Sequence, residues 1–182
     1  MEYVFKNSPK DKLRKIVLTD DGFNLIMDGA TYPYKYSSVN QVWLNSPGGF
    51  CSPGEYSCTL NIVDQKPLYI SSKNYSDSKK LIDQFNHYNS FIRVLHLHLK
   101  NNKAAQFKFG TTPFKYLTRI MVIIGILTAC VLSIMLLEAN PLVFIVPSGL
   151  AIFVSVCGMK FCINRFPKVY NPENIPLTLL PA

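Results

Sequence analysis

The sequence lacks the short motifs in which many enzymes carry their reactive residues. It contains no G-x-S-x-G, no H-E-x-x-H, no Walker-type glycine loop and no G-x-G-x-x-G. Such motifs hold a nucleophile, a metal or a phosphate beside a positioned base or backbone. Glu138 and Glu173 have no partner base or nucleophile that the sequence identifies. We therefore expect a protein that is not an enzyme, with no catalytic residue and no cofactor.

The spacing of the cysteines and histidines does not fit a metal centre. The five cysteines are an odd number, and six residues separate Cys51 from Cys58, which fits neither a disulfide framework nor a zinc site. His96 and His98 lie two residues apart on a predicted helix, so they point to different faces and cannot share one metal. We expect no metal site and a structural role for the histidines.

We also expect neither a cleavable signal sequence nor a basic nucleic-acid-binding domain. The N-terminal stretch MEYVFKNSPKDKLRK has no apolar h-region. The net charge of +8 is uneven, because residues 1–99 contribute +2 and residues 100–182 contribute +6. A nucleic-acid-binding protein carries its basic patch on the folded domain. We therefore expect no nucleic-acid partner, and we attribute the excess charge to anionic lipid headgroups.

Two long runs without a charged residue organise the chain. Eighteen such residues follow one another over 120–137, and nineteen over 141–159. About twenty helical residues cross roughly 30 Å of hydrocarbon, and each run reaches that length with its flank. A buried helical hairpin in a soluble core is the alternative, but a soluble helix normally keeps a polar face. We predict transmembrane helices over 113–138 and 141–163.

The ends and the polar content of these runs support the same interpretation. Thr112-Pro113 and Asn140-Pro141 are each typical of an N-cap followed by the first helical residue. Pro147 lies within the second run, where a neighbouring helix can satisfy the freed carbonyl, so we expect a kink and no break. Neither run holds an ionisable residue other than cysteine. Transport pathways usually need such residues, so we expect the hairpin to be an anchor or a packing surface and not a pathway.

Basic residues gather at the two outer ends of the predicted hairpin, eight of them, and the connecting turn has none. The positive-inside rule then predicts an integral protein of the inner (cytoplasmic) membrane with both termini in the cytoplasm. We expect non-specific contact of these cations with anionic headgroups, the alternative being a specific headgroup pocket. They are Lys100, Lys103, Lys108, Lys115, Arg119, Lys160, Arg165 and Lys168.

Short apolar or alternating runs separated by turn signals predict about seven strands before residue 73. Asp28-Gly29, between two of them, is a strong hairpin signal because glycine tolerates a positive φ. Trp43 and Tyr34 are interpreted as core or rim aromatics of the resulting β structure. The predicted strands are Glu2–Lys6, Lys15–Thr19, Phe23–Met27, Ala30–Tyr34, Gln41–Leu44, Cys58–Val63 and Leu68–Ser72.

One long helix is predicted over residues 76–101. Ser76 is a plausible N-cap, and Asp77 would lie favourably near the positive end of the helix. An apolar stripe at helical spacing would pack against the open side of the sheet. The stripe consists of Leu81, Phe85, Tyr88, Ile92, Leu95 and Leu99.

This order of elements resembles bacterial pleckstrin-homology-like (PH/GRAM-like) domains of membrane proteins. IVLTDDGFNLI followed by YPYKYSSVNQVWL, and CTLNIVDQKPLYISSKN followed by LIDQFNHYNSFI, carry the resemblance over residues 1–100. It implies an α+β membrane protein with a seven-stranded barrel or sandwich capped by one helix over 1–103. It also implies binding or scaffolding, although such a fold hosts many functions. Residues 36–65 hold no Lys or Arg, so we do not expect specific phosphoinositide binding.

Residues 104–112 are predicted to be a linker, and 164–182 an extended, proline-rich cytoplasmic tail. The tail is rich in apolar residues, so we expect it to pack either on its own β domain or on a separate subunit. Phe50 and Tyr56, in or beside a Gly/Pro-rich loop, are expected to contact a partner or to touch the membrane surface; the alternative is a loop that packs on itself. The predicted partner-binding residues are Phe50, Tyr56, Tyr170, Pro172, Ile175, Pro176, Leu179 and Leu180.

These features predict a membrane-anchored accessory or scaffold subunit, whose cytoplasmic domain and tail bind other proteins of a larger inner-membrane complex. One alternative is a lipid-headgroup-binding or membrane-stress sensor that acts alone through its basic residues. Another is a small immunity-type membrane protein. An enzyme would need chemistry supplied by a second chain.

Overall fold

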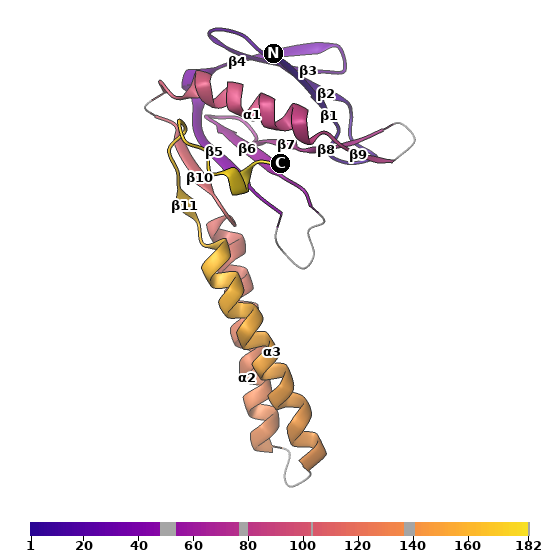
Figure 1. The fold of residues 1–182 in the computed structure, drawn as a ribbon. Coiled ribbons are helices and arrows are strands. Elements are labelled where there is room, and N and C mark those ends of the chain that lie inside the picture. Colours follow the sequence, from indigo (N-terminus) through magenta and orange to yellow (C-terminus); the bar gives the residue numbers. More distant parts are fainter. Residues whose placement is uncertain (48–53, 77–79, 103, 137–140, 182) are drawn as a thin grey trace. The chain divides into compact units, whose positions relative to one another are not determined.

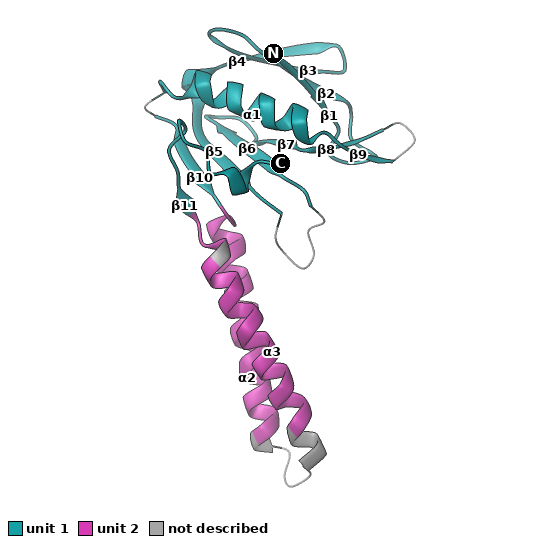
Figure 2. Ribbon diagram, in the orientation of Figure 1, with its two compact units in different colours: residues 1–109, 168–182 teal, residues 110–167 magenta. Residues whose placement is uncertain are grey.

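The protein consists of two compact units, shown in Figure 2. The computed structural model describes residues 1–47, 54–76, 80–102, 104–136 and 141–181. Unit 1 combines Met1–Phe109 with Lys168–Ala182, and unit 2 is Gly110–Pro167. Both sheets and helices are present, so the predicted α+β class is confirmed.

The N-terminal strands form an antiparallel sheet in the order β1-β2-β3-β4 (Figure 1). Each strand lies within one residue of its predicted bounds. The turn between the last two has positive φ at both central residues, 54° at Asp28 and 78° at Gly29, as the Asp-Gly signal predicts. The strands are β1 (Glu2–Phe5), β2 (Arg14–Leu18), β3 (Gly22–Met27) and β4 (Ala30–Lys35).

A second sheet brings together segments that are far apart in the sequence, in the order β11-β10-β5-β6-β7. Strand β10 runs parallel to β5, and every other neighbouring pair is antiparallel. The predicted linker over 104–112 therefore contains a strand, and so does the predicted extended tail over 164–182, whose first two residues are still helical. The strands are β5 (Val39–Asn45), β6 (Ser57–Ile62), β7 (Leu68–Ser71), β10 (Gln106–Phe109) and β11 (Lys168–Val169).

The sheets are open, so the structure does not show the closed barrel that the resemblance implies. A barrel needs an unbroken backbone ladder around its circumference. Among the described residues, β1 reaches β7 through a side chain, since the Tyr3 hydroxyl donates to the Ser71 carbonyl over 2.7 Å. A single backbone hydrogen bond of 3.2 Å, from Tyr75 N–H to the Lys6 carbonyl, lies nearby.

The predicted helix begins nine residues later than expected, because α1 spans Phe85–Leu99. The residues before it form the hairpin of β8 (Lys73–Tyr75) and β9 (Leu81–Asp83), closed by a 2.9 Å hydrogen bond from Ser76 N–H to the Lys80 carbonyl. Ser76 is therefore not an N-cap. Leu81, the first residue of the predicted stripe, is 44% exposed on this hairpin.

From Tyr88 onward the apolar stripe is the buried face of α1, as predicted, and Figure 1 shows this helix crossing the strands. Its side chains join those of both larger sheets in one core. The Tyr3 ring of β1 stacks on Phe91 of α1 with ring centroids 5.0 Å apart. Trp43 is buried, in agreement with its predicted place.

Unit 2 is a hairpin of two helices, α2 (Pro113–Leu136) and α3 (Pro141–Arg165), which begin at the predicted prolines. Pro147 lies inside α3, and the helix continues through it. The most apolar segments, Pro113–Ile134 and Ile145–Ile163, have mean hydropathies of 2.3 and 1.8, and only 6% of each is buried. Both helices are therefore long and apolar enough to cross a membrane.

The two helices approach closely where their side chains are small or flat. A Cβ added at Gly158 of α3 would lie 3.2 Å from the Ile123 side chain of α2. The Tyr116 and Phe161 rings stack with centroids 5.5 Å apart. Small residues permit this kind of packing between apolar helices.

Candidate functional site

The C-terminal segment folds onto unit 1, which decides between the two placements that the sequence left open. Strand β11 pairs with β10, with Lys168 opposite Phe109 and Val169 opposite Lys108. Tyr170 N–H then donates to the Phe107 carbonyl over 3.1 Å. Further on, Leu179 and Leu180 are buried in the core. The tail is therefore a structural part of its own domain.

A buried pair of side chains holds the start of this segment to α1. His96 Nδ1 lies 2.7 Å from the Ile92 carbonyl oxygen, and His96 Nε2 lies 2.6 Å from the Tyr170 hydroxyl. A carbonyl only accepts, so Nδ1 carries the proton and donates to Ile92. Nε2 of the neutral ring then accepts from the Tyr170 O–H, and both ring nitrogens are satisfied.

Burial keeps this histidine neutral. It lowers the pKa of His96 to about 4, and the hydrogen bond to the Ile92 backbone opposes that shift in part. Burial also raises the pKa of the Tyr170 hydroxyl, so this group stays protonated as a donor. A neutral ring with both nitrogens engaged is not placed to act as a general base.

A second attachment holds the end of the segment. Asn89 Nδ2 donates to the Pro181 carbonyl over 3.1 Å, and Asn89 Oδ1 accepts from Arg93 Nε over 2.7 Å. The short 3₁₀ helix η2 (Leu177–Leu179) precedes this point. Residues 171–176 therefore form an arch that is fixed at both ends.

The arch has hydrogen bonds of its own. Asn171 Oδ1 accepts from Glu173 N–H over 3.0 Å, and the Asn171 carbonyl accepts from Asn174 N–H over 3.1 Å. This is the local pattern by which an asparagine side chain stabilises a turn. The arch is thereby given a defined conformation above α1.

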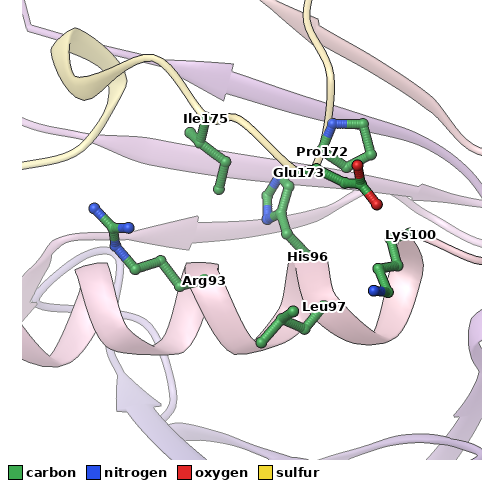
Figure 3. Close-up of a pocket in the computed structure, with 7 residues that line it drawn as sticks. All are labelled: Arg93, His96, Leu97, Lys100, Pro172, Glu173 and Ile175. Atoms are coloured by element: carbon green, nitrogen blue, oxygen red, sulfur yellow. The ribbon is translucent and has the colours of Figure 1, made fainter.

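A hollow of about 400 Å³ lies between α1 and the arch, and Figure 3 shows the side chains around it. The helical residues that line it are spaced by three, one and three positions, which places them on one face of α1. Leu97 is 61% exposed, so the hollow is open to solvent. The lining residues are Arg93, His96, Leu97, Lys100, Pro172, Glu173 and Ile175.

The hollow is lined by both charged and apolar side chains. Arg93 and Lys100 are cationic, Glu173 is anionic, and the neutral His96 is already bonded through both nitrogens. Leu97, Pro172 and Ile175 add apolar area. In the part of the chain that the structure describes, no three His, Cys, Asp or Glu residues are grouped to hold a metal ion.

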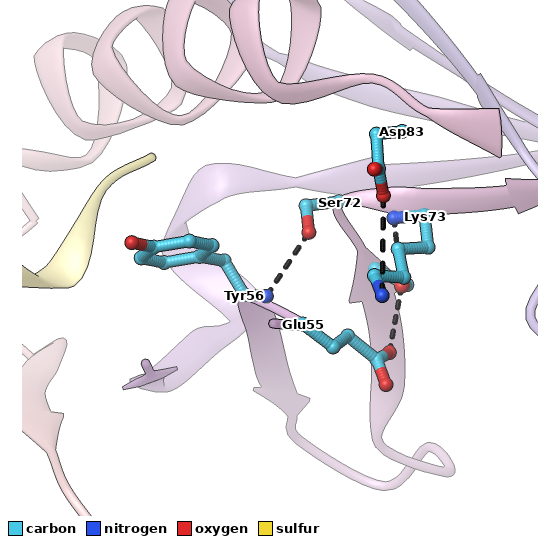
Figure 4. Close-up of polar contacts among 6 residues, drawn as sticks. Glu55, Tyr56, Ser72, Lys73 and Asp83 are labelled. Carbon is cyan, nitrogen blue, oxygen red and sulfur yellow. Dashed lines mark hydrogen bonds and ion pairs between the residues drawn. The ribbon is translucent and has the colours of Figure 1, made fainter. Parts of the chain in front are cut away.

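A second polar cluster, drawn in Figure 4, joins the segment before β6 to the strands beyond it. Ser71 Oγ donates to Glu55 Oε1 over 2.7 Å, and Tyr56 N–H donates to Ser72 Oγ over 3.0 Å. Lys73 Nζ lies 3.9 Å from Asp83 on the neighbouring strand. These bonds connect consecutive elements of one sheet region, so we assign them a structural role.

The predicted headgroup-binding residues are divided between the two units. Lys100, Lys108 and Lys168 belong to unit 1, and the latter two lie on the paired strands β10 and β11. Lys103 lies outside the described residues. In unit 2, the Arg119 guanidinium lies 5.4 Å from the centroid of the Phe161 ring. The others in unit 2 are Lys115, Lys160 and Arg165.

The predicted partner-binding residues differ in how exposed they are and in where they lie in the fold. Tyr170, Leu179 and Leu180 are buried against their own domain, so a partner could reach them only after the tail is displaced. Pro172 and Ile175 line the hollow, and Pro176 is half-buried beside it.

The two loop residues of that set lie elsewhere. Tyr56 is half-buried and packs edge-on against Phe85, with ring centroids 6.0 Å apart. Tyr56 therefore packs on α1 of its own domain, a contact that none of the alternatives drawn from the sequence describes. Phe50 lies outside the described residues.

Sequence reasoning did not identify the hollow. The sequence pattern gives no functional role to Arg93, and Glu173 is noted there only because it lacks a partner base or nucleophile. One signal was available: Leu97 is an apolar residue that does not fit the stripe, next to the cations Arg93 and Lys100. The facing arch could not be predicted, because its position depends on the folded-back tail.

Comparisons of the chain with protein-family models, with curated proteins and with solved structures find no match. The resemblance to pleckstrin-homology-like domains therefore stays a prediction. The function has to be inferred from the two apolar helices and from the geometry of unit 1.

Proposed function

We propose that this protein is a non-catalytic, membrane-anchored accessory or scaffold subunit of a larger complex in a bacterial inner membrane. Unit 2 would be its anchor, and unit 1, a pleckstrin-homology-like module on the cytoplasmic face, would bind other proteins. The two termini would both lie in the cytoplasm, as the positive-inside rule favours.

The hydroxyl groups of α2 support the role of an anchor. Thr118, Thr128 and Ser133 each donate to the carbonyl four residues earlier, over 2.8 to 2.9 Å. A hydroxyl satisfied by its own helix can face lipid at little cost. Helices that carry solutes usually present polar or ionisable groups to a pathway instead.

The open hollow of unit 1 is the observation that carries the proposal of protein binding. On the α1 side it combines the exposed Leu97 with the cations Arg93 and Lys100, and the facing arch is fixed at two points. Preorganised surfaces of this kind bind with a smaller loss of conformational entropy. An anchor joined to a fixed, unreactive surface is the arrangement expected of a scaffold subunit.

Purification of the full chain from native membranes in a mild detergent tests the proposal. We expect a complex with a second protein in fixed stoichiometry, identified by size-exclusion chromatography and mass spectrometry. The matched control is the hairpin Gly110–Pro167 fused to an unrelated soluble protein, which should not retain the second protein. A monodisperse monomer from the native membrane would contradict the proposal.

A lipid-binding role is the second candidate, and the basic residues of unit 2 favour it. Lys115 and Arg119 lie in the first two turns of α2, and Lys160 and Arg165 near the end of α3. Each cation at a membrane surface contributes about 1 kcal/mol of attraction to anionic lipid. If unit 1 and these cations act alone, vesicle binding should depend on phosphatidylglycerol content and need no protein partner.

A further inference from the structure

We propose that the hollow between α1 and the arch binds a segment of a partner protein in which a Glu or Asp lies next to a bulky apolar residue. This inference rests on the proposed function, because it names the surface used and the chemistry of the partner.

The C-terminal segment that forms one wall of the hollow is held in place by hydrogen bonds. This outer wall, residues 172–175, lies between two attachments: the Tyr170–His96 hydrogen bond of 2.6 Å and the Asn89–Pro181 hydrogen bond of 3.1 Å. Ile175 also packs against the core from the arch. A partner segment therefore meets a wall that needs no further ordering, which favours affinity.

The charges of the hollow select a carboxylate. Arg93 and Lys100 lie seven residues apart on α1, two turns along one face, and Figure 3 shows them on either side of Leu97. The bond from Arg93 Nε to Asn89 positions the guanidinium, whose remaining N–H groups can still donate to an acid. With Glu173 the net charge is +1, so a single acidic side chain is the complementary ligand.

Glu173 limits how many acids the hollow accepts. It belongs to the arch, on the side opposite the helical cations, and it is exposed. A second carboxylate in the ligand would be repelled by it, whereas a backbone N–H of a peptide could donate to it. This arrangement favours a peptide with one acidic residue over a strongly acidic tail.

The apolar residues of the hollow favour a bulky apolar residue next to the acidic residue of the partner segment. Leu97, Pro172 and Ile175 face the same hollow, and covering exposed apolar area is favourable by roughly 25 cal/mol per Å². Small-molecule sites usually enclose most of their ligand. Because Leu97 is 61% exposed, the open side suits a chain that lies across the hollow better than an enclosed small molecule.

Fluorescence polarisation on the full chain in nanodiscs tests this, with amidated, labelled hexapeptides of sequence Gly-Ser-Glu-Leu-Ser-Gly as the probe. Matched peptides replace the central pair by Gln-Leu, Lys-Leu or Glu-Ser. We expect the Glu-Leu peptide to bind about ten-fold more tightly than each of these, since a charge-assisted bond and a buried leucine are each worth roughly that factor.

Three variants assign the binding to the hollow. Lys100→Glu, which leaves the attachments of the arch intact, should weaken binding of the Glu-Leu peptide about ten-fold, and Glu173→Gln should strengthen it about three-fold. Lys66→Glu, an exposed position on the turn after β6, is the control and should change neither value. Resistance of the tail to carboxypeptidase checks that each variant keeps the tail docked.

Equal binding of the four peptides, or a Glu-Leu preference that survives Lys100→Glu, would overturn the inference. Tighter, Lys100-dependent binding of decanoate would replace the peptide by a small amphiphilic acid and would also overturn it. If the native partner still co-purifies while the peptides show no preference, only this inference fails. Absence of any partner from the wild-type complex would instead contradict the proposed function.

Discussion

The two units of this chain treat their apolar residues in opposite ways. In unit 1, Phe91 is fully buried between the helix and the sheets, whereas in unit 2 Phe153 is 59% exposed. The buried arrangement of unit 1 is the one expected in water, because burial of apolar surface is the main favourable term in folding. The exposed arrangement of unit 2 fits the two candidate membrane-spanning helices, since lipid is as apolar as the exposed side chains. The two units therefore differ in where their large apolar side chains lie, inside a core in unit 1 and on the helix surface in unit 2.

The C-terminal segment belongs to unit 1 in this respect, although it follows unit 2 in the sequence. Tyr170, Leu179 and Leu180 are buried with the core of unit 1. Strand β11 reaches them directly after the hairpin. The domain is thus formed from two pieces of chain that the hairpin separates, and it is complete only after both helices have been made.

The largest expected effect comes from truncating one phenylalanine in each unit. Phe91→Ala leaves a cavity in the core of unit 1 and should lower its free energy of unfolding by about 4 kcal/mol. Phe153→Ala should leave that value unchanged. Urea unfolding in detergent, followed through the fluorescence of Trp43, measures both. If both substitutions lowered the free energy of unfolding equally, the proposed difference in burial between the two units would be contradicted.

Acid should destabilise unit 1 through His96. Its pKa is lowered to about 4 from an ordinary value of 6.5, so between these pH values the unfolded chain binds a proton that the folded chain excludes. Stability is therefore fully present above pH 6.5 and falls towards pH 4, by on the order of 3 kcal/mol from this group. Urea midpoints of unfolding, measured at intervals of half a pH unit, would show this loss of stability.

Two variants separate His96 from other titrating groups. His98→Gln should keep the full slope between pH 6.5 and 5, and His96→Gln should flatten it. The three histidines, His87, His96 and His98, all belong to unit 1, so the helical circular dichroism of the hairpin should be insensitive to this range. A slope that His96→Gln leaves unchanged would show that His96 does not cause it.

The C-terminal tail contains two leucines, two positions apart, that differ in burial and can be compared directly. Leu179 is buried and Leu177 is 80% exposed, both in η2. Leu179→Ala should lower the free energy of unfolding of unit 1 by about 2 kcal/mol, and Leu177→Ala should leave it nearly unchanged. The same urea titration measures both. Identical costs would indicate that the tail does not dock on unit 1.

The smallest effect is expected inside the hairpin. Gly158→Val places a side chain against Ile123 and should loosen helix packing by about 1 kcal/mol. Gly125→Val meets open space, since nothing lies within 4 Å of a Cβ at that position. Thermal melting of the hairpin signal in detergent compares them. If Gly125→Val proves the more disruptive, α2 and α3 pack through other faces.

Local signals in the sequence predicted much of the fold. The apolar runs gave the two helices of unit 2 and their first residues, Pro113 and Pro141. Alternation and turn residues gave seven strands, and Asp28-Gly29 gave a turn with positive φ. In each case the determining interactions lie within about ten residues of one another, which periodicity can detect.

What could not be predicted depends on pairing between distant segments. Leu81 fits a helical stripe by spacing, yet β9 pairs with β8 and removes it from the helix. Phe107 and Phe109 alternate as in a strand, but their partner β5 lies more than sixty residues earlier. The hollow combines residues of α1 with residues that follow unit 2. The sequence contains both sets, but it does not indicate that they lie next to each other in the fold.

The central claim is that unit 2 crosses a membrane and leaves unit 1 with its docked tail in the cytoplasm. Labelling with a membrane-impermeant maleimide tests it most directly, using Lys66→Cys and Leu177→Cys, one at a time, in a chain without other cysteines. In right-side-out membrane vesicles we expect neither position to react, and in inside-out vesicles we expect both to react. Reaction of either position in right-side-out vesicles, or release of the chain by alkaline carbonate, would contradict the account.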